Sequence, residues 1–156
     1  MHPTGKPQSE DVFVRVARAI AAAGRQLLPS EFGCSEFAGD VWLGHQGQAI
    51  TGSGVASTLE WRIDDVDGEE VLVKVERVEP GEVVRVAEHF LDRMQDFVTE
   101  MRAGLGFPAI PWPPVPDKPL GEFADGRAEL RDGELRLWYE TEQGPVSPVA
   151  AVPLAL

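Results

Sequence analysis

Hydrophobic and polar residues follow two different periods along this chain, and each period predicts a kind of secondary structure. Apolar residues recur at helical spacing over residues 10–27 and again over residues 83–102. The second stripe is continuous and consists of Val86, Ala87, Phe90, Leu91, Met94, Phe97, Val98 and Met101. A stripe this wide is typical of a helix that packs on a sheet, and less often of a dimer seam. The pattern therefore predicts two amphipathic helices.

The first helix also carries a basic stripe on the side away from its apolar residues. Arg15, Arg18 and Arg25 share this side because their spacing follows the helical repeat. The stripe either binds an acidic partner, or it faces solvent or lies beside an acidic part of the same chain. Pro29 is expected to end the helix.

A period of two predicts a hairpin over residues 55–78. Leu59, Trp61 and Ile63 share one face of its first strand, and residues 64–68 supply an Asp-Gly turn. Enrichment in valine in the return strand agrees with strand geometry.

The same period predicts a second hairpin over residues 127–142. In its second strand, Leu135, Leu137 and Tyr139 share one face and alternate with Arg136, Trp138 and Glu140 on the other. A final strand over residues 149–156 contains Pro153, which places that strand at a sheet edge.

Together these elements predict an α+β fold with a single domain over residues 9–156. A largely antiparallel sheet made from both hairpins packs on the second helix, and the first helix is either peripheral or completes a second layer. Residues 1–8 form a flexible tail. The six prolines of residues 107–119 form an extended connector anchored by Trp112, or else a docking segment for an aromatic groove. Residues 30–54 are expected to form a mobile loop or an irregular edge hairpin.

Charge narrows the range of partners. The net charge is −12, and residues 31–103 hold sixteen acidic and six basic residues, a net of −10. Such a surface repels nucleic acid and anionic membranes and attracts basic partners. There is no apolar run of membrane-spanning length and no secretory signal near the N-terminus, so we expect a cytoplasmic protein.

Candidate chemistry is sparse. The single cysteine, Cys34, lies within twelve residues of Asp40 and His45, but the sequence around it lacks the signature of a cysteine protease. A lone cysteine is more often a small buried side chain than a nucleophile. The three histidines lack metal-ligand spacing, and the glycines of residues 44–54 lack the context of a phosphate-binding loop. We therefore predict no catalytic residue, no metal and no cofactor.

These observations favour a non-enzymatic interaction protein that binds a basic protein partner. In architecture and acidity the chain is similar to small bacterial immunity and adaptor proteins, a resemblance that assigns no residue. Acidic side chains would steer the partner and tryptophans would supply the binding energy. The predicted binding residues are Trp42, Asp64, Asp65, Asp67, Glu69, Trp112 and Trp138.

Two other functions stay open at this point. One is a small-ligand-binding domain or minor enzyme whose pocket lies between helix and sheet, lined by Trp61, Trp138 and Tyr139, with His45 or His89 at the rim. The other is a structural assembly component, and a homodimer is possible.

Overall fold

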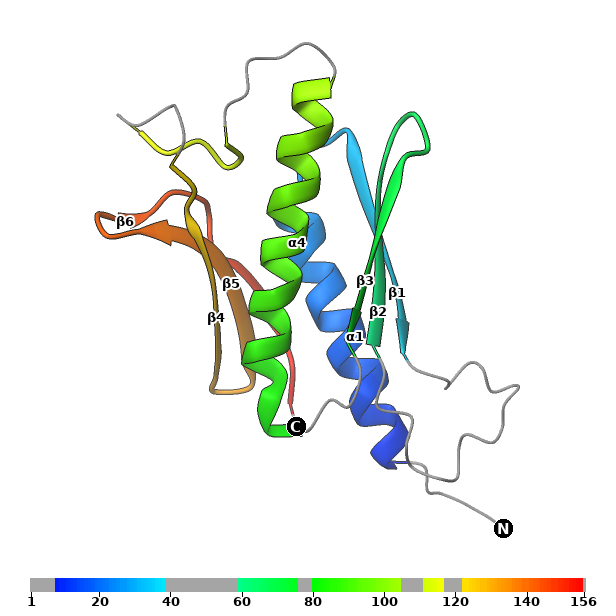
Figure 1. Cartoon of the computed structure of the whole chain (residues 1–156). Helices are drawn as coiled ribbons and strands as arrows, with labels where there is room; N and C mark the ends of the chain where they lie inside the picture. Colours follow the sequence, from blue (N-terminus) through cyan, green and yellow to red (C-terminus); the bar gives the residue numbers. More distant parts are fainter. Residues whose placement is uncertain (1–7, 39–58, 76–79, 105–110, 117–121, 156) are drawn as a thin grey trace.

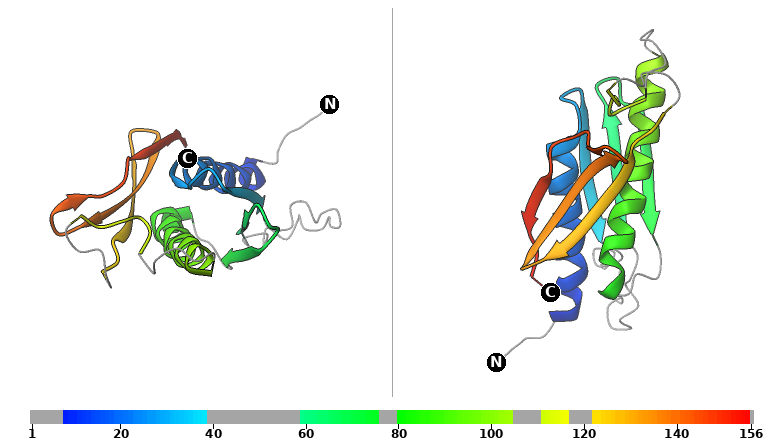
Figure 2. Two further views of the ribbon diagram at one scale, coloured as in Figure 1. Left: turned by 90° about the horizontal axis from the view of Figure 1, so that it is seen from above. Right: turned by 90° about the vertical axis from the view of Figure 1, so that its left-hand side faces the viewer.

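Two helices lie between two small antiparallel sheets. The computed structural model describes residues 8–38, 59–75, 80–104, 111–116 and 122–155. Helix α1 (Gln8–Leu27) and helix α4 (Val83–Gly104, preceded by the short helix η2, Pro80–Glu82) form the middle layer (Figure 1). Seen from above in Figure 2, one sheet lies on each side of this helix pair. The predicted α+β class and both predicted helices are confirmed.

The first sheet contains β1 (Phe32–Ala38), β2 (Leu59–Asp65) and β3 (Glu70–Val75), in that order. The predicted facing of β2 is confirmed, because Leu59, Trp61 and Ile63 are fully buried and pair with the valines of β3. Strand β1 falls in the segment that we expected to be a loop or irregular hairpin. Its sequence is rich in small and polar residues, so its strand character comes from antiparallel pairing with β2 along its whole length.

The second sheet contains β4 (Asp125–Arg131), β5 (Glu134–Thr141), β6 (Gly144–Pro145) and β7 (Ala150–Pro153). Strand β5 is central and pairs with the other three strands, so β7 is an edge strand as predicted. The β4–β5 turn has positive φ at Asp132 and Gly133, 54° and 74°, which Asp and Gly tolerate best. The two predicted hairpins do not share one sheet, because each turns its apolar face to the helices from an opposite side.

Helix α1 is part of the central layer and not peripheral. Val16, Ala17, Ile20, Ala21 and Ala23 are at most 1% exposed, and the helix contacts strands of both sheets. Alanine makes this position possible. Its side chain is small enough for a sheet to approach the helix backbone, and it is apolar, so that its burial leaves no polar group without a partner. The second of the two predicted positions for this helix, in a second layer, is therefore the observed one.

Two glycines allow backbone segments to approach α4 closely. A Cβ atom at Gly24 of α1 would lie 2.8 Å from the ring of Phe90, and one at Gly126 of β4 would lie 2.6 Å from the Cβ of Leu91. Both distances are shorter than real contacts of a Cβ atom. The packing of α4 against α1 and against β4 thus depends on the absence of a side chain at these two positions.

One aromatic side chain from each sheet donates a hydrogen bond to a helix backbone. The Trp61 indole N–H of β2 donates to the Ala17 carbonyl of α1 at 3.0 Å, and the Tyr139 hydroxyl of β5 donates to the Leu91 carbonyl of α4 at 2.6 Å. Both rings are fully buried, so each needs such a partner. These bonds fix the position of each sheet relative to one helix.

Filling the space at Gly126 should destabilise the protein. For Gly126→Ala we expect a loss of about 1–3 kcal/mol in the free energy of unfolding, because the new methyl group overlaps Leu91. Urea denaturation measures this loss. Gly104→Ala is the matched control, since nothing lies within 4 Å of a Cβ there, and it should leave stability unchanged or slightly raised. Equal effects of both substitutions would contradict the packing described here.

The phenol of Tyr139 should resist ionisation while the protein is folded. Burial raises its pKa well above the ordinary value of 10.0, and the nearby Asp92 and Asp96 raise it further. The unfolded chain therefore releases this proton first, and stability should fall as the pH rises above 10. The chain has one tyrosine, so tyrosinate absorbance reports Tyr139 alone. Ionisation of the folded protein near pH 10, without unfolding, would contradict the buried hydrogen bond.

Candidate functional site

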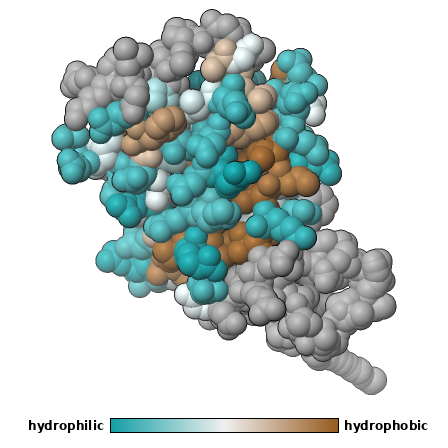
Figure 3. Space-filling view, viewed as in Figure 1, coloured by the Kyte–Doolittle hydropathy of each residue, from teal (hydrophilic) through white to brown (hydrophobic). Residues whose placement is uncertain are grey.

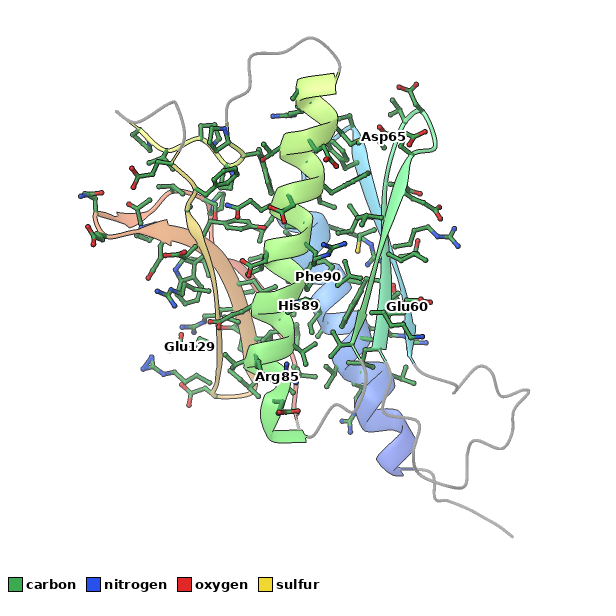
Figure 4. The ribbon with its side chains drawn as sticks, in the orientation of Figure 1. Glu60, Asp65, Arg85, His89, Phe90 and Glu129 are labelled. Atoms are coloured by element: carbon green, nitrogen blue, oxygen red, sulfur yellow. The ribbon has the colours of Figure 1, made fainter. Side chains whose placement is uncertain are left out.

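Acidic side chains gather on the exposed side of α4 and at the start of β4. We call Glu88, Asp92, Asp96 and Asp125 the acidic strip. The three α4 residues are spaced four apart and therefore form a row along one helix face. Glu88 is half-buried and the three aspartates are exposed. Arg85 and His89 of α4, both labelled in Figure 4, are exposed as well.

Polar side chains of α4 hold the neighbouring backbone in place beside this strip. The Ala128 N–H of β4 donates to the Glu88 carboxylate at 3.1 Å, and the Gln95 amide donates to the Ala124 carbonyl at 2.9 Å. Further along the helix, the Trp112 N–H donates to the Thr99 hydroxyl at 3.0 Å. These bonds fix the start of β4 against α4, and they place Asp125 close enough to Asp92 to affect its ionisation.

The carboxylates of the strip repel one another. The pKa of Asp92 is raised, first by partial burial and then by Asp96, with smaller effects from Asp125 and Glu88, while His89 opposes the rise. The same negative potential reaches the core, where Asp92 and Asp96 raise the pKa of Tyr139. Within the described residues, no lysine or arginine forms an ion pair with any of the three aspartates. The strip is thus a concentration of negative charge whose aspartates have no ion-pair partner in the described part of the chain.

The predicted acidic turn lies elsewhere, at the tip of the β2–β3 hairpin (Figure 4). Asp65 closes this turn: its carboxylate accepts the N–H groups of Asp67 and Glu69 at 2.9 and 3.0 Å. Asp65 is therefore a structural acceptor, whereas the Asp67 and Glu69 side chains are exposed and Asp64 is half-buried. In the described parts of the chain, no group of three or more acidic, histidine or cysteine side chains is arranged to hold a metal ion.

Two of the three predicted tryptophans, Trp112 and Trp138, lie away from this turn, with the second sheet. Trp112 is only 8% exposed and packs edge-on against Tyr139, 5.4 Å between ring centroids, which corrects the expectation that it is an exposed binding residue. It anchors the proline segment to the core, as the connector interpretation predicts. Trp138 lies half-buried on the outer face of the second sheet and donates to Glu140 at 2.9 Å. Trp42 lies outside the described residues.

The basic stripe of α1 is used in part by its own chain. Arg25 donates to the Cys34 carbonyl at 2.9 Å and forms an ion pair with Glu36 at 2.8 Å, both on β1. Arg15 donates to the Ala155 carbonyl at 3.1 Å. For these two arginines, the interpretation that the stripe lies beside the same chain agrees with the structure.

The aromatic side chains predicted to line a pocket do not converge on one. Trp61 belongs to the first sheet and Tyr139 to the second, and both are completely buried among core side chains. Trp138 points to the opposite face of β5 from Tyr139. His89 is exposed on α4, and His45 lies outside the described residues.

Cys34 has the surroundings of a structural cysteine. It faces Ile63 in the first sheet and is 9% exposed. Burial raises the pKa of its thiol from 9.0 to about 12, an effect that Arg25 only partly offsets. A thiol with so high a pKa is a poor nucleophile at neutral pH. Asp40 and His45, its candidate catalytic partners, lie outside the described residues.

Comparisons with known proteins give no relative: no family model, no curated protein and no solved structure matches the chain. Neither of the two long helices has an apolar stretch of the length and composition needed to cross a membrane. The functional argument therefore depends on the surface of the molecule itself. The four-residue spacing of Glu88, Asp92 and Asp96 is enough to place them on one helix face, but the contribution of Asp125 depends on the packing of β4 on α4.

The thiol of Cys34 should be unreactive in the folded protein. Because its pKa is about 12, very little thiolate exists at pH 8, and a thiol-specific disulfide reagent should react much more slowly than with the same protein in denaturant. Absorbance of the released chromophore measures both rates. Reaction of the native protein at the rate of the denatured chain would show that the thiol is accessible and ionised.

Neutralising Asp92 should stabilise the protein at neutral pH. Its folded-state pKa is raised above the ordinary value of 3.8, so the stability linked to its proton is present below that value and is lost as the pH rises through the folded pKa. Asp92→Asn should therefore unfold at a higher urea concentration than the native protein at pH 7, and the difference should shrink as the pH falls toward 3.8. Asp67→Asn, at the hairpin tip, controls for the change in total charge. A stabilisation that is the same at all pH values would contradict this account.

Proposed function

We propose that the protein is a non-enzymatic interaction protein that binds a basic protein partner through the acidic strip. The observation that carries the proposal is the row of Glu88, Asp92 and Asp96 along one face of α4, where both aspartates are exposed and Asp125 of β4 lies close enough to affect Asp92. A cationic side chain placed against the strip would reduce the repulsion between these carboxylates. A basic partner surface would therefore be attracted to this position.

The geometry of the strip defines the kind of partner surface that fits it. Residues four apart on a helix are separated by about 6 Å along the axis, so the row of Glu88, Asp92 and Asp96 presents carboxylates at regular intervals. A partner helix or loop with lysine or arginine at a similar spacing would meet this row. The net charge of −12 would accelerate the encounter, and the rate would fall as salt increases.

The test compares two variants that lose the same charge at different places. Asp92→Asn/Asp96→Asn neutralises the strip, and Asp67→Asn/Glu69→Gln neutralises the exposed part of the hairpin tip. Each variant and the native protein are immobilised, exposed to lysate of the source cells at low and moderate salt, and analysed by quantitative mass spectrometry. We expect a stoichiometric basic protein that elutes as salt rises and that is lost with the strip variant but retained by the tip variant.

Binding measurements with the purified partner then give the loss of affinity that each substitution causes. Each removed charge contact should weaken binding by about tenfold when the contact is desolvated, and less when it remains at the rim. If the strip variant still binds the partner and the tip variant does not, the interface is the acidic turn that was predicted from the sequence. Failure of all three proteins to capture a basic partner at either salt concentration would contradict the proposed function.

A further inference from the structure

The outer face of the second sheet carries both signs of charge around one tryptophan. Side chains alternate along β4 and β5, so every second one points away from the helices. Beyond Asp125, which belongs to the acidic strip, these outward residues are Arg127, Glu129, Arg131, Glu134, Arg136, Trp138 and Glu140. Their three arginines balance their three glutamates. This face is therefore close to neutral on a chain whose net charge is −12.

The described structure leaves this face exposed. In the right-hand view of Figure 2, β4, β5 and β7 lie in front of both helices, and no described helix or strand lies in front of them. The Arg127 and Arg131 side chains are 48% and 60% exposed, and Val149, just before β7, is 48% exposed. The coloured residues on this side of the molecule, at the left in Figure 3, are mostly hydrophilic.

The charges of this face pair with one another. Arg127 pairs with Glu140 at 3.2 Å, and Arg136 pairs with Glu134 at 2.8 Å and with Glu129 at 3.7 Å. All of these side chains are about a third or more exposed, and exposed ion pairs contribute little to stability. Exchanging them for pairs with another molecule would therefore cost little.

The register of β4 and β5 makes the face complementary to itself. Arg127 lies opposite Trp138, and the next outward row has Glu129 opposite Arg136. A twofold axis that runs across the strands, between these two rows, exchanges them. Arg127 of one copy then lies over Glu129 of the other and can form an ion pair with it. Trp138 lies over the second Arg136, in the arrangement of a cation–π contact.

We propose that the protein forms a symmetric dimer through the outer faces of its second sheets. Tryptophan and arginine are the residues that most often dominate the binding energy of such interfaces. A basic partner suits this face poorly, because its arginines would repel that partner, whereas a second acidic copy can approach where the charge is balanced. This surface is separate from the acidic strip, so the proposal does not depend on the proposed function.

The size of the face sets the expected affinity. Three strands about 4.8 Å apart and seven residues at about 3.4 Å each give a face of about 14 by 20 Å. Such an area is at the low end for specific interfaces. We therefore expect a weak dimer, with a Kd in the micromolar range.

The test uses sedimentation velocity of the full chain at about 0.15 M salt, where the Debye length of about 8 Å screens the long-range repulsion between two acidic molecules. The native protein should show a monomer–dimer equilibrium. Arg127→Glu sets two pairs of carboxylates against each other across the axis, and Glu129→Arg does the same with arginines. Each variant alone should dimerise at least about tenfold more weakly.

An equimolar mixture of these two variants should associate as well as the native protein. In the mixed dimer the new carboxylate at position 127 faces the new guanidinium at position 129, and the unchanged Glu129 faces the unchanged Arg127. A loss of folding cannot give this result. Glu69→Arg, at the hairpin tip of the first sheet, is the matched control for charge and should dimerise like the native protein.

NMR provides a second measurement on the same proteins. The indole N–H signal of Trp138 should shift with protein concentration, and that of the buried Trp61 should not. A native protein that stays monomeric, single variants that dimerise like it, or a mixture that associates no better than either variant would each overturn the proposal. Capture of a basic partner that is lost with Glu129→Arg but kept by Asp92→Asn/Asp96→Asn would assign this face to that partner and would also overturn it.

Discussion

The burial of two helices between two sheets is the constraint on which the rest of this structure depends. A helix that packs on one sheet needs a single apolar stripe, and a helix with a sheet on either side needs a wider one. Helix α1 meets this need with alanines at the contacts, and α4 meets it with Phe90, Leu91 and Met94, which are all completely buried. Glycine at positions 24 and 126 removes the remaining overlap. The Trp61 and Tyr139 hydrogen bonds then set where each sheet lies along its helix.

The same constraint determines where charge can lie. Each sheet and each helix contributes one face to the core. The polar surface therefore consists of the outer faces of the sheets and the exposed side of each helix. On the second sheet the outer charges are balanced, because Arg127 pairs with Glu140 and Arg136 pairs with both Glu129 and Glu134. On α4, Asp92 and Asp96 are exposed and have no ion-pair partner among the described residues, although the helix also carries three arginines. The acidic strip is therefore a concentrated feature, and the overall charge of −12 does not by itself describe it.

The elements of the fold could be predicted from periodicity, whereas their arrangement could not. The α4 stripe and the alternation in β2 and β5 are strong local patterns, and the structure confirms them. Local pattern does not show which sheet a hairpin joins, so one predicted sheet became two. Strand β1 lacks a pattern because its conformation depends on pairing with β2. For the candidate site, the sequence could identify acidic residues on one face of α4, but only the packing of β4 brings Asp125 to them and removes Trp112 from the surface.

Helix α4 contacts the two sheets with different kinds of side chain. The hydrogen-bonding side chains Glu88, Gln95 and Thr99 all act on the side of the helix that faces β4 and the proline segment. Toward the first sheet, the helix presents aromatic rings: Phe90 packs against Trp61, and Phe97 packs edge-on against Phe32. A phenylalanine side chain stabilises a sheet through its apolar ring but has no donor or acceptor for a backbone N–H or C=O group. Helix α4 therefore holds the second sheet by hydrogen bonds as well as by packing, and it holds the first sheet through these aromatic contacts.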